Sequence, residues 1–334
     1  MFRLPERWTT PETFEDTIDV DGVTIHRAAL ASRGPGGEAT GSAADVVDAR
    51  AVAERARFEL LERAAILEAM DARDHVVLDV GGTPVGMLDR ASVFLESDAP
   101  ASWRYARSNG VALHRGWDAA CLAARRELVE RDRVLRAWSG LTRPEVVALD
   151  DALLVGEGKS FVWMARAFPR APGTTFGDDL EVVGAFAFPL RPGLPLAFGY
   201  AARATGQEAL AAALREARQM LSFLWGEELP TASPPLAPTA VFHLDAFQVP
   251  DRRGILRRWL DHGHGRLGGS VPEPPKGVAV TERAETVYVD LTPPWMAGSY
   301  RVAKAMCAEA TPLAFGRGPF FPHLADELQI HPIT

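Results

Sequence analysis

The sequence predicts a mixed α/β or α+β fold, and two observations support this. Three long segments, at residues 44–72, 108–138 and 206–228, repeat apolar residues with the period of an amphipathic helix. Between them lie shorter segments with the composition of strands, several of them bounded by glycine-containing turns. Because helices and strands alternate only loosely along the chain, the pattern favours a mixed class over an all-helical or all-strand one.

Length and composition indicate a globular protein with a large core. The chain has 334 residues, 47% of them hydrophobic, enough for one large domain or two ordinary ones. A formal net charge of −8 argues against a nucleic-acid partner and against binding to an acidic membrane surface. Cys121 and Cys307 are too few for a disulfide framework or a cysteine metal cage. The sequence shows neither a signal-peptide pattern nor an apolar run that could span a membrane, so we expect a cytoplasmic protein.

Residues 1–43 are expected to be a short lead and connector ahead of the main domain, which we place at 44–334. A strand is predicted within Thr17–Ala28, behind a polar start. The segment Ser32–Ser42 is rich in glycine and small residues, which is typical of a loop.

The second long helix follows a turn at Ser108-Asn109-Gly110 and carries charges on its apolar side. Residues three and four apart share a face of a helix, so Glu127, Glu130 and Arg131 point the same way, among small and apolar neighbours. The other side is expected to face solvent; it holds Arg125, Arg126, Asp132, Arg133 and Arg136. Buried carboxylates are costly unless a cation accompanies them, so we expect a cationic ligand beside Glu127 and Glu130.

The first long helix repeats this pattern. Glu59, Glu62 and Arg63 share a face with apolar residues, and the opposite side is expected to hold Arg50, Glu54, Arg57 and Glu68. An ordinary amphipathic helix with ion pairs would explain either helix alone, but its repetition on the less polar side of both favours a ligand site. Four inward carboxylates and two arginines suit Mg²⁺ and phosphate, because Mg²⁺ binds carboxylates together with substrate phosphates and arginine grips phosphate oxygens.

The third long helix, Gly206–Glu228, is the least distinctive. Its apolar face contains Glu216 together with Ala209, Met220 and Phe223, and Gln219 lies at the margin. An ordinary amphipathic helix explains this pattern equally well, so the residues alone leave both interpretations open.

The remaining elements are short. Strands are predicted at His75–Val80, Val85–Leu88, Ala152–Val155, Ser160–Phe168, Val182–Phe188, Leu196–Ala202, Thr286–Leu291 and Ser299–Met306. A strand or an irregular segment is predicted at Phe242–Val249, and an irregular tail at Ala310–Thr334.

Two short patterns are similar to ligand sites. Gly158-Lys159-Ser160 matches the end of a P-loop, but that motif needs a glycine where Leu153 stands and a helix where a strand is predicted. We therefore expect a hairpin turn, with no nucleotide contact from Lys159. His262 and His264 lie in a segment rich in glycine and proline; they could bind a metal only with further ligands, and a mobile loop is the alternative.

Several stretches together resemble the YcaO-domain family. The Ser108-Asn109-Gly110 turn followed by Glu-Leu-Val-Glu-Arg-Asp at 127–132 is similar to its signature, and Glu59 to Arg63 and Glu216 to Gln219 are similar to its other two site helices. Its C-terminal core resembles Val287–Thr292, Tyr300–Lys304 and Pro312–Gly316. The resemblance runs from residue 44 to the end and implies a YcaO-like fold, with mixed sheets and long glutamate-bearing helices around an ATP site.

The resemblance also implies a function: ATP-dependent activation of peptide backbone amides. In the azoline-forming branch, a Cys, Ser or Thr side chain of a ribosomal precursor peptide attacks the preceding carbonyl. ATP then phosphorylates the amide oxygen, which makes it a good leaving group. By this resemblance Mg²⁺ is held by Glu59, Glu62, Glu127 and Glu130. ATP contacts these four and Arg63, Ser108, Asn109, Arg131, Glu216 and Gln219, and the catalytic residues are Glu127, Glu130, Arg131 and Thr334.

The resemblance further implies partners. A precursor peptide is the expected substrate, a separate protein is expected to bind its leader, and a flavin-dependent dehydrogenase and a homo-oligomer are further options. His331-Pro332 partly matches the proline-rich end of azoline-forming relatives, whereas the region before Glu59 lacks a serine often found there. Thioamide or amidine formation and a non-catalytic scaffold role remain as alternatives.

Overall fold

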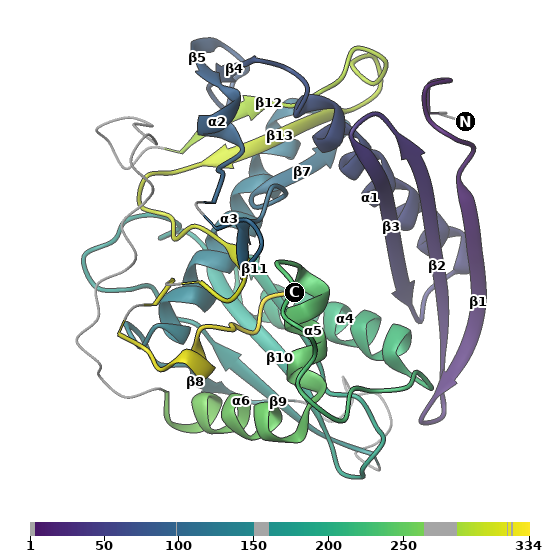
Figure 1. The fold of residues 1–334 in the computed structure, drawn as a ribbon, viewed down its shortest axis with the longest axis vertical. Coiled ribbons are helices and arrows are strands. Elements are labelled where there is room, and N and C mark those ends of the chain that lie inside the picture. Colours follow the sequence, from purple (N-terminus) through teal and green to yellow (C-terminus); the bar gives the residue numbers. More distant parts are fainter. Residues whose placement is uncertain (1–3, 98, 150–159, 264–285, 319, 322) are drawn as a thin grey trace. The chain divides into compact units, whose positions relative to one another are not determined.

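The computed structural model describes residues 4–97, 99–149, 160–263, 286–318, 320–321 and 323–334. The chain divides into two compact units, and most of their elements are labelled in Figure 1. Unit 1 consists of Met1–Leu95, Arg107–Leu128 and Gly277–Ala308; unit 2 consists of Glu96–Ala106, Val129–Lys276 and Glu309–Thr334.

Unit 1 begins with an antiparallel three-stranded sheet of β1 (Glu12–Val20), β2 (Val23–Gly34) and β3 (Gly37–Asp45). Helix α1 (Ala49–Ala69), the first predicted long helix, packs on this sheet. The approach is close at Gly41, where a Cβ atom would overlap the Ala56 carbonyl oxygen and the Leu60 amide nitrogen. Only a glycine permits this contact, so the glycine serves helix packing.

The prediction of a loop at Ser32–Ser42 is therefore wrong. This segment ends β2 and forms the first part of β3, and the expected domain boundary after residue 43 falls inside β3. Ala39, Gly41 and Ala43 alternate on the face that α1 covers, and small side chains suit a strand beneath a closely packed helix.

A second antiparallel sheet of unit 1 has the strand order β5-β4-β12-β13-β7. Its strands are β4 (Asp74–Leu78), β5 (Pro84–Asp89), β7 (Val111–His114), β12 (Val287–Asp290) and β13 (Arg301–Met306), and a short helix α2 (Arg90–Val93) follows β5. Leu61, Ala65 and Ile66 of α1 share a core with Val77, Val289 and Val302 of this sheet. Helix α1 thus buries residues against both sheets. The four strands predicted here are confirmed, while β7 was not expected.

Unit 2 contains an antiparallel sheet of order β11-β10-β9-β8. The strands are β8 (Glu145–Val147), β9 (Phe161–Ala167), β10 (Glu181–Pro189) and β11 (Ala197–Arg203), and the last three confirm the prediction. Helix α4 (Gly206–Leu224) confirms the third long helix. It approaches β11 closely at Gly199, where a Cβ would lie 2.5 Å from the Ala217 nitrogen.

The rest of unit 2 differs more from expectation. Phe242–Val249 forms most of helix α5 (Ala240–Gln248), which the Thr239 hydroxyl caps by accepting a hydrogen bond from the Phe242 N–H. The prediction of a strand or an irregular segment there is wrong. Helix α6 (Pro250–His262) follows directly, and β14 (Ala314–Gly316) pairs with β6 (Trp103–Tyr105).

The segment Ala310–Thr334 is mostly irregular, as predicted, apart from β14 and a 3-10 helix η3 (Asp326–Leu328). It is not frayed. Ile330, His331 and Ile333 are buried, and the Trp138 indole donates a 2.7 Å hydrogen bond to the Leu328 carbonyl oxygen.

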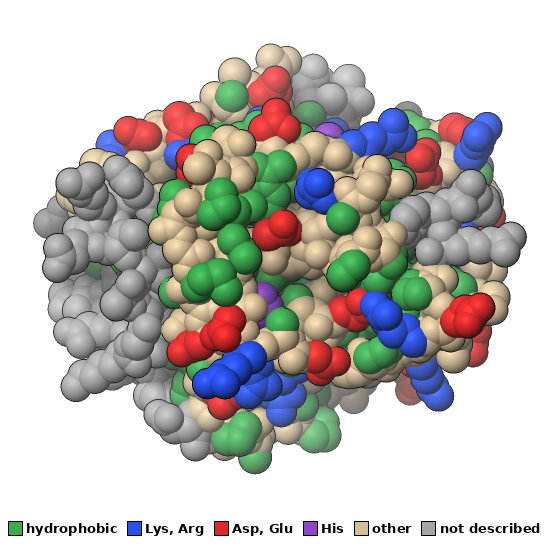
Figure 2. All heavy atoms as spheres, turned by 90° about the horizontal axis from the view of Figure 1, so that it is seen from above, with side chains coloured by type: hydrophobic (Ala, Val, Ile, Leu, Met, Phe, Trp, Pro, Cys, Tyr) green, Lys and Arg blue, Asp and Glu red, His purple; other side chains and the backbone are tan. Residues whose placement is uncertain are grey.

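Helix α3 (Trp117–Trp138), the second predicted long helix, contributes residues to both units. None of the helices in the described parts of the chain is long and apolar enough to cross a membrane. On the face drawn in Figure 2, acidic and basic side chains are interspersed with apolar and uncharged ones.

Candidate active site

Two predicted glutamates of α1 are held by strand backbone in unit 1. Glu59 Oε2 accepts a hydrogen bond of 2.9 Å from the N–H of Ser42 on β3, and Glu62 Oε2 accepts one of 2.9 Å from the N–H of Leu113 on β7. Arg63 lies 3.5 Å from the other oxygen of Glu59. The main chain therefore fixes one oxygen of each carboxylate.

The carboxyl group of Glu62 has a strongly perturbed pKa. Burial raises its pKa to about 8, with a further increase from the charge of Glu127 on α3 and a smaller one from Glu59. Arg63 and the Leu113 N–H act in the opposite direction. Like charges that jointly raise a pKa in this way are a common feature of functional sites, because a bound cation would stabilise the ionised carboxylates.

These residues fit Mg²⁺ bound together with a phosphate ligand. Among the described residues, no three His, Cys, Asp or Glu side chains form a complete metal-binding group by themselves. Mg²⁺ is usually held by one or two carboxylates, with water and substrate phosphates completing its octahedron. The carboxylates of Glu59 and Glu127, which both raise the pKa of Glu62, suit such an ion.

The predicted Ser108-Asn109-Gly110 turn precedes β7 in unit 1. Gly110 has a φ of 67°, in the left-handed region, and the Val111 N–H donates a 3.2 Å bond to the Ser108 carbonyl oxygen. The turn is a well-defined element, as the sequence indicates.

The site residues predicted in unit 2 lie around β11. Glu216 on α4 is exposed, but its Oε2 accepts a 3.4 Å hydrogen bond from the Tyr200 N–H. Burial raises the pKa of the Tyr200 hydroxyl well above its ordinary value, and the charge of Glu130 on α3 adds to this. Glu130 and Glu216 therefore both lie close to Tyr200, and Gln219 is half-buried one turn further along α4.

Arg131 lies close to the last residues of the chain. Burial lowers the pKa of His331 well below its ordinary value, and neighbouring His243 and, to a smaller extent, Arg131 lower it further. Arg131 and His331 therefore lie near one another within unit 2. Thr334 itself is partly exposed.

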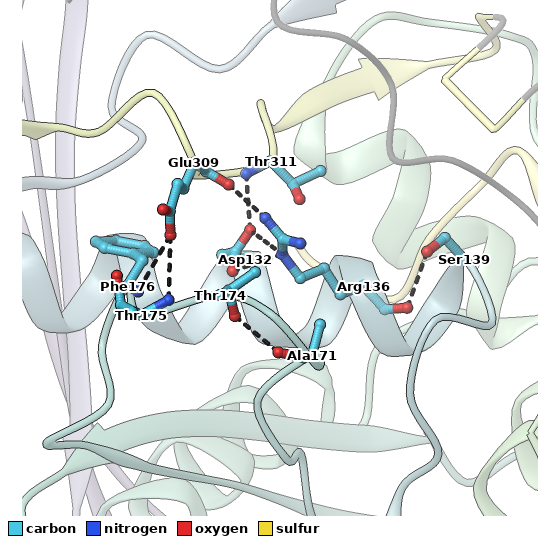
Figure 3. A network of polar contacts seen from close by, with 9 residues as sticks. All are labelled: Asp132, Arg136, Ser139, Ala171, Thr174, Thr175, Phe176, Glu309 and Thr311. Carbon is cyan, nitrogen blue, oxygen red and sulfur yellow. Dashed lines mark hydrogen bonds and ion pairs between the residues drawn. The ribbon is translucent and has the colours of Figure 1, made fainter. Parts of the chain in front are cut away.

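The prediction that one side of α3 faces solvent is wrong for three of its residues. Asp132, Arg133 and Arg136 are buried, and Figure 3 shows the contacts of two of them. Arg136 Nε donates to both Asp132 oxygens, at 2.8 and 2.9 Å, and Arg136 also donates to the Glu309 carbonyl oxygen. Asp132 accepts a 2.7 Å bond from the Thr311 N–H. A segment distant in sequence covers this side of the helix.

The carboxylate of Glu309 extends the same network. It accepts hydrogen bonds from the N–H groups of Thr175 and Phe176, at 3.3 and 3.2 Å (Figure 3). Residues 309–311 thus connect α3 with the loop at 174–177. Their contact with α3 includes Asp132, the residue that follows Arg131.

The prediction that Glu68 on α1 faces solvent is also wrong. Its side chain is only 10% exposed, although the helical pattern placed it towards solvent. It accepts hydrogen bonds from Arg7 and from the indoles of Trp8 and Trp295, and those indole bonds are both 2.7 Å long. Because these partners satisfy the carboxylate, we assign Glu68 a structural role.

Sequence reasoning missed Ser42, whose N–H holds Glu59. The alternation of small residues through Ala39, Gly41 and Ala43 could have indicated a strand there. Lys159 and His264 lie outside the described residues, as does the strand predicted at Ala152–Val155; His262 is the last residue of α6.

Comparisons with known proteins identify the class. The fold is shared with solved YcaO and heterocyclase structures, and one family model matches more than half of the sequence. The family described as YcaO cyclodehydratase, ATP- and Mg²⁺-binding, matches residues 84–310. The chain belongs to the YcaO family. No curated protein matches the sequence.

Solved structures agree with this fold at low sequence identity. YcaO from Methanopyrus kandleri, bound with AMPPCP and Mg²⁺, has a TM-score of 0.60 at 18% identity and covers 90% of this chain and 85% of its own. The E. coli microcin synthetase McbBCD complex with pro-MccB17 bound has a TM-score of 0.56 at 10% identity, covering 89% and 87%. A heterocyclase in complex with substrate and cofactor has a TM-score of 0.52 at 15% identity, covering 96% of this chain and 54% of its own.

Proposed function

We propose that this protein is an ATP-dependent peptide cyclodehydratase, which converts Cys, Ser or Thr residues of a ribosomal precursor peptide into azolines. The observation that carries the proposal is the group of Glu59, Glu62 and Glu127, in which burial and the neighbouring carboxylates raise the pKa of Glu62 to about 8 although Arg63 opposes them. A member of an ATP- and Mg²⁺-binding family needs such a group to hold the metal–nucleotide complex.

The chain's own residues have distinct roles in this proposal. Glu59, Glu62, Glu127 and Glu130 hold Mg²⁺, and Glu216 and Gln219 contact the nucleotide together with Ser108 and Asn109. When bound, ATP supplies the phosphoryl group that activates the amide oxygen, and Mg²⁺ neutralises its charge. Arg63 and Arg131 orient the phosphates, and a fixed cation at that place stabilises the charge that develops during transfer. Thr334 lies in the same catalytic set.

The backbone hydrogen bonds to Glu59 and Glu62 support this assignment. Each carboxylate is oriented before any ligand arrives, so little conformational entropy is lost on binding. Phosphoryl transfer depends mainly on positioning and charge neutralisation, and both need rigid ligands.

We further propose that partner proteins complete the substrate-binding site. A precursor peptide is flexible, so ordering it at the site carries a large entropic cost, which a leader-binding partner would offset by raising its effective concentration. A flavin-dependent dehydrogenase would act after cyclisation, on the azoline product.

The test combines the purified chain, its leader-binding partner, a precursor peptide encoded beside its gene, ATP and Mg²⁺. We expect ATP consumption and loss of one water mass for each cyclised residue, measured by mass spectrometry. Glu127→Gln should abolish both, whereas Glu54→Gln, at an exposed position of α1, should leave both unchanged. Replacement of oxygen by sulfur in the peptide would favour the thioamide alternative, and a wild-type chain that consumes no ATP would contradict the proposal.

A further inference from the structure

We propose that Lys304 is a positioning residue for nucleotide binding, which holds the Ser108–Gly110 turn so that its N–H side can receive a phosphate group. Lys304 lies on β13 of unit 1 and is 6% exposed. Its Nζ donates to the carbonyl oxygens of Arg107, at 3.1 Å, and Asn109, at 2.7 Å. The inference rests on the proposed function, because it concerns the same nucleotide.

The turn is fastened at a second point by the next residue of the strand. The Ala305 N–H donates a 2.8 Å hydrogen bond to the Gly110 carbonyl oxygen. Gly110 fits closely, since a Cβ atom there would lie 2.9 Å from the Ala305 carbonyl oxygen and 3.2 Å from Leu128 Cβ. Two adjacent residues of β13 thus determine where the turn lies relative to α3 and β7.

The direction of the held carbonyls decides what the turn offers on its other side. In a planar trans peptide the C=O and N–H groups point in opposite directions. Because Lys304 binds the carbonyl oxygens of Arg107 and Asn109, the N–H groups of Ser108 and Gly110 point away from Lys304. N–H groups aligned in a turn with a left-handed residue make a concave anion site of the kind that receives phosphate.

A lysine suits this task chemically. An ammonium group carries three donors and no acceptor, so it can satisfy several carbonyl oxygens from one buried point. Its charge is further stabilised by the ring of Phe94, whose centroid lies 5.9 Å from Nζ. The buried charge is therefore compensated by the protein itself, and Lys304 acts on the nucleotide only through the turn.

The experiment measures nucleotide affinity in matched variants of the full chain. Wild type, Lys304→Met and Lys304→Gln are titrated with Mg-AMPPCP and, separately, with Mg-tripolyphosphate, by calorimetry well below their melting temperatures. Val302→Ala is the control. It removes buried volume from the same strand without changing a residue that contacts the turn, so it tests whether a loss of stability in β13 alone weakens binding.

We expect Lys304→Met to weaken both ligands by about tenfold or more, a typical effect of removing a charge-assisted hydrogen-bond donor. Lys304→Gln, which keeps donors, should recover part of the affinity, and Val302→Ala should stay within about twofold of wild type, as a remote change does. If Lys304→Met does not fold, the Gln variant carries the comparison.

Three outcomes separate the possibilities. A wild-type chain that does not bind Mg-AMPPCP refutes the proposed function itself. Binding by wild type that survives in the Lys304 variants overturns the positioning role. Loss of AMPPCP affinity with unchanged tripolyphosphate affinity overturns it too, because a phosphate-facing turn must affect both.

Discussion

The side chain of His243 donates from Nδ1 to the main-chain carbonyl oxygen of His331, over 2.9 Å, and the two imidazole rings lie 4.4 Å apart. The Gly316 N–H approaches His243 Nε2 at 3.0 Å, so that nitrogen is an acceptor and the proton resides on Nδ1. His331 Nε2 in turn lies 2.7 Å from the Ala314 carbonyl oxygen, and its Nδ1 accepts from the Ile333 N–H. Both rings are therefore neutral in the folded chain, each in one tautomer.

This relationship predicts a loss of stability in acid. Burial lowers the pKa of His243 from 6.5 to about 4, opposed by its two backbone hydrogen bonds. Arg252 of α6 further disfavours a positive charge on His243, and Arg131 of α3 disfavours one on neighbouring His331. Because the unfolded chain binds the proton more readily, the contribution of His243 to stability is constant above about pH 6.5 and falls towards pH 4. At about 1.4 kcal/mol per pKa unit, the loss is on the order of 3 kcal/mol.

The measurement is the thermal midpoint between pH 4 and 8. His243→Gln cannot be protonated and should make the acid branch shallower, with the remainder due to buried His331, whereas His114→Gln, at an exposed position of β7, should keep the full branch. An acid branch that persists unchanged in His243→Gln would show that another group is responsible.

The buried pair Asp132–Arg136 should contribute much more to stability than a surface pair. Asp132→Ala leaves the Arg136 guanidinium and the Thr311 N–H without this acceptor in a buried place, at a cost of about 3 kcal/mol. Glu38→Ala removes the partner of Arg33 on the surface, where the side chains are 46% and 81% exposed, and should cost less than about 0.5 kcal/mol. Denaturant unfolding of the two variants decides the matter, and equal effects would contradict the role of the network in Figure 3.

Glu62→Gln should stabilise the ligand-free chain while abolishing ATP turnover. The raised pKa of Glu62 means that its charge is disfavoured in the fold, so its contribution to stability declines as pH rises from about 4.5 to about 8. Glutamine keeps the acceptor for the Leu113 N–H and removes the charge. We expect a melting temperature higher by a few degrees at pH 8, the size of a change of about 1 kcal/mol in a domain of this length.

Glu54→Gln, on the exposed side of the same helix, is the matched control and should change neither property. A lower melting temperature for Glu62→Gln, or normal turnover, would contradict the assignment of Glu62 as a ligand held ready for a cation.

Gly41→Ala should be far more damaging than Gly86→Ala. A methyl group at Gly41 meets the main chain of α1, which cannot move without displacing Glu59, whereas nothing lies within 4 Å of the corresponding position at Gly86. Overpacking against backbone costs about 1–3 kcal/mol. Thermal unfolding together with Mg-AMPPCP titration should show loss of both stability and affinity in Gly41→Ala only; comparable behaviour of the two variants would argue against the close approach of α1 and β3.

The three long helices could be predicted because apolar residues recur in each with the period of a helix. The buried side of each helix agrees in large part with the side that this period predicts. Glu59, Glu62 and Glu127 could be placed on the protein side for the same reason. Periodicity ranks the two faces of a helix by polarity, but it does not show whether a distant segment covers the polar one. Asp132 and Arg136 are covered by residues 309–311, and Glu68 by Arg7, Trp8 and Trp295, so their burial depends on tertiary contacts.

Composition gave a wrong prediction where small residues are needed for close packing of a helix on a strand. The segment Ser32–Ser42 has few large apolar residues, because α1 lies too close to leave room for them. Ala240–Gln248 is apolar on most sides and short, so its helical period is weak, and the Thr239 cap was the available signal.

Glu59 of α1 and Glu216 of α4 share one further property, which determines which neighbouring residues can change during evolution. Glu59 is held by the N–H of the residue after Gly41, and Glu216 by the N–H of the residue after Gly199. Every amino acid except proline supplies that N–H, so the residue itself is free to change: it is serine in the first case and tyrosine in the second. The preceding glycine has no such freedom. Substitutions can therefore accumulate beside these carboxylates without loss of their orientation, provided that the glycines are retained.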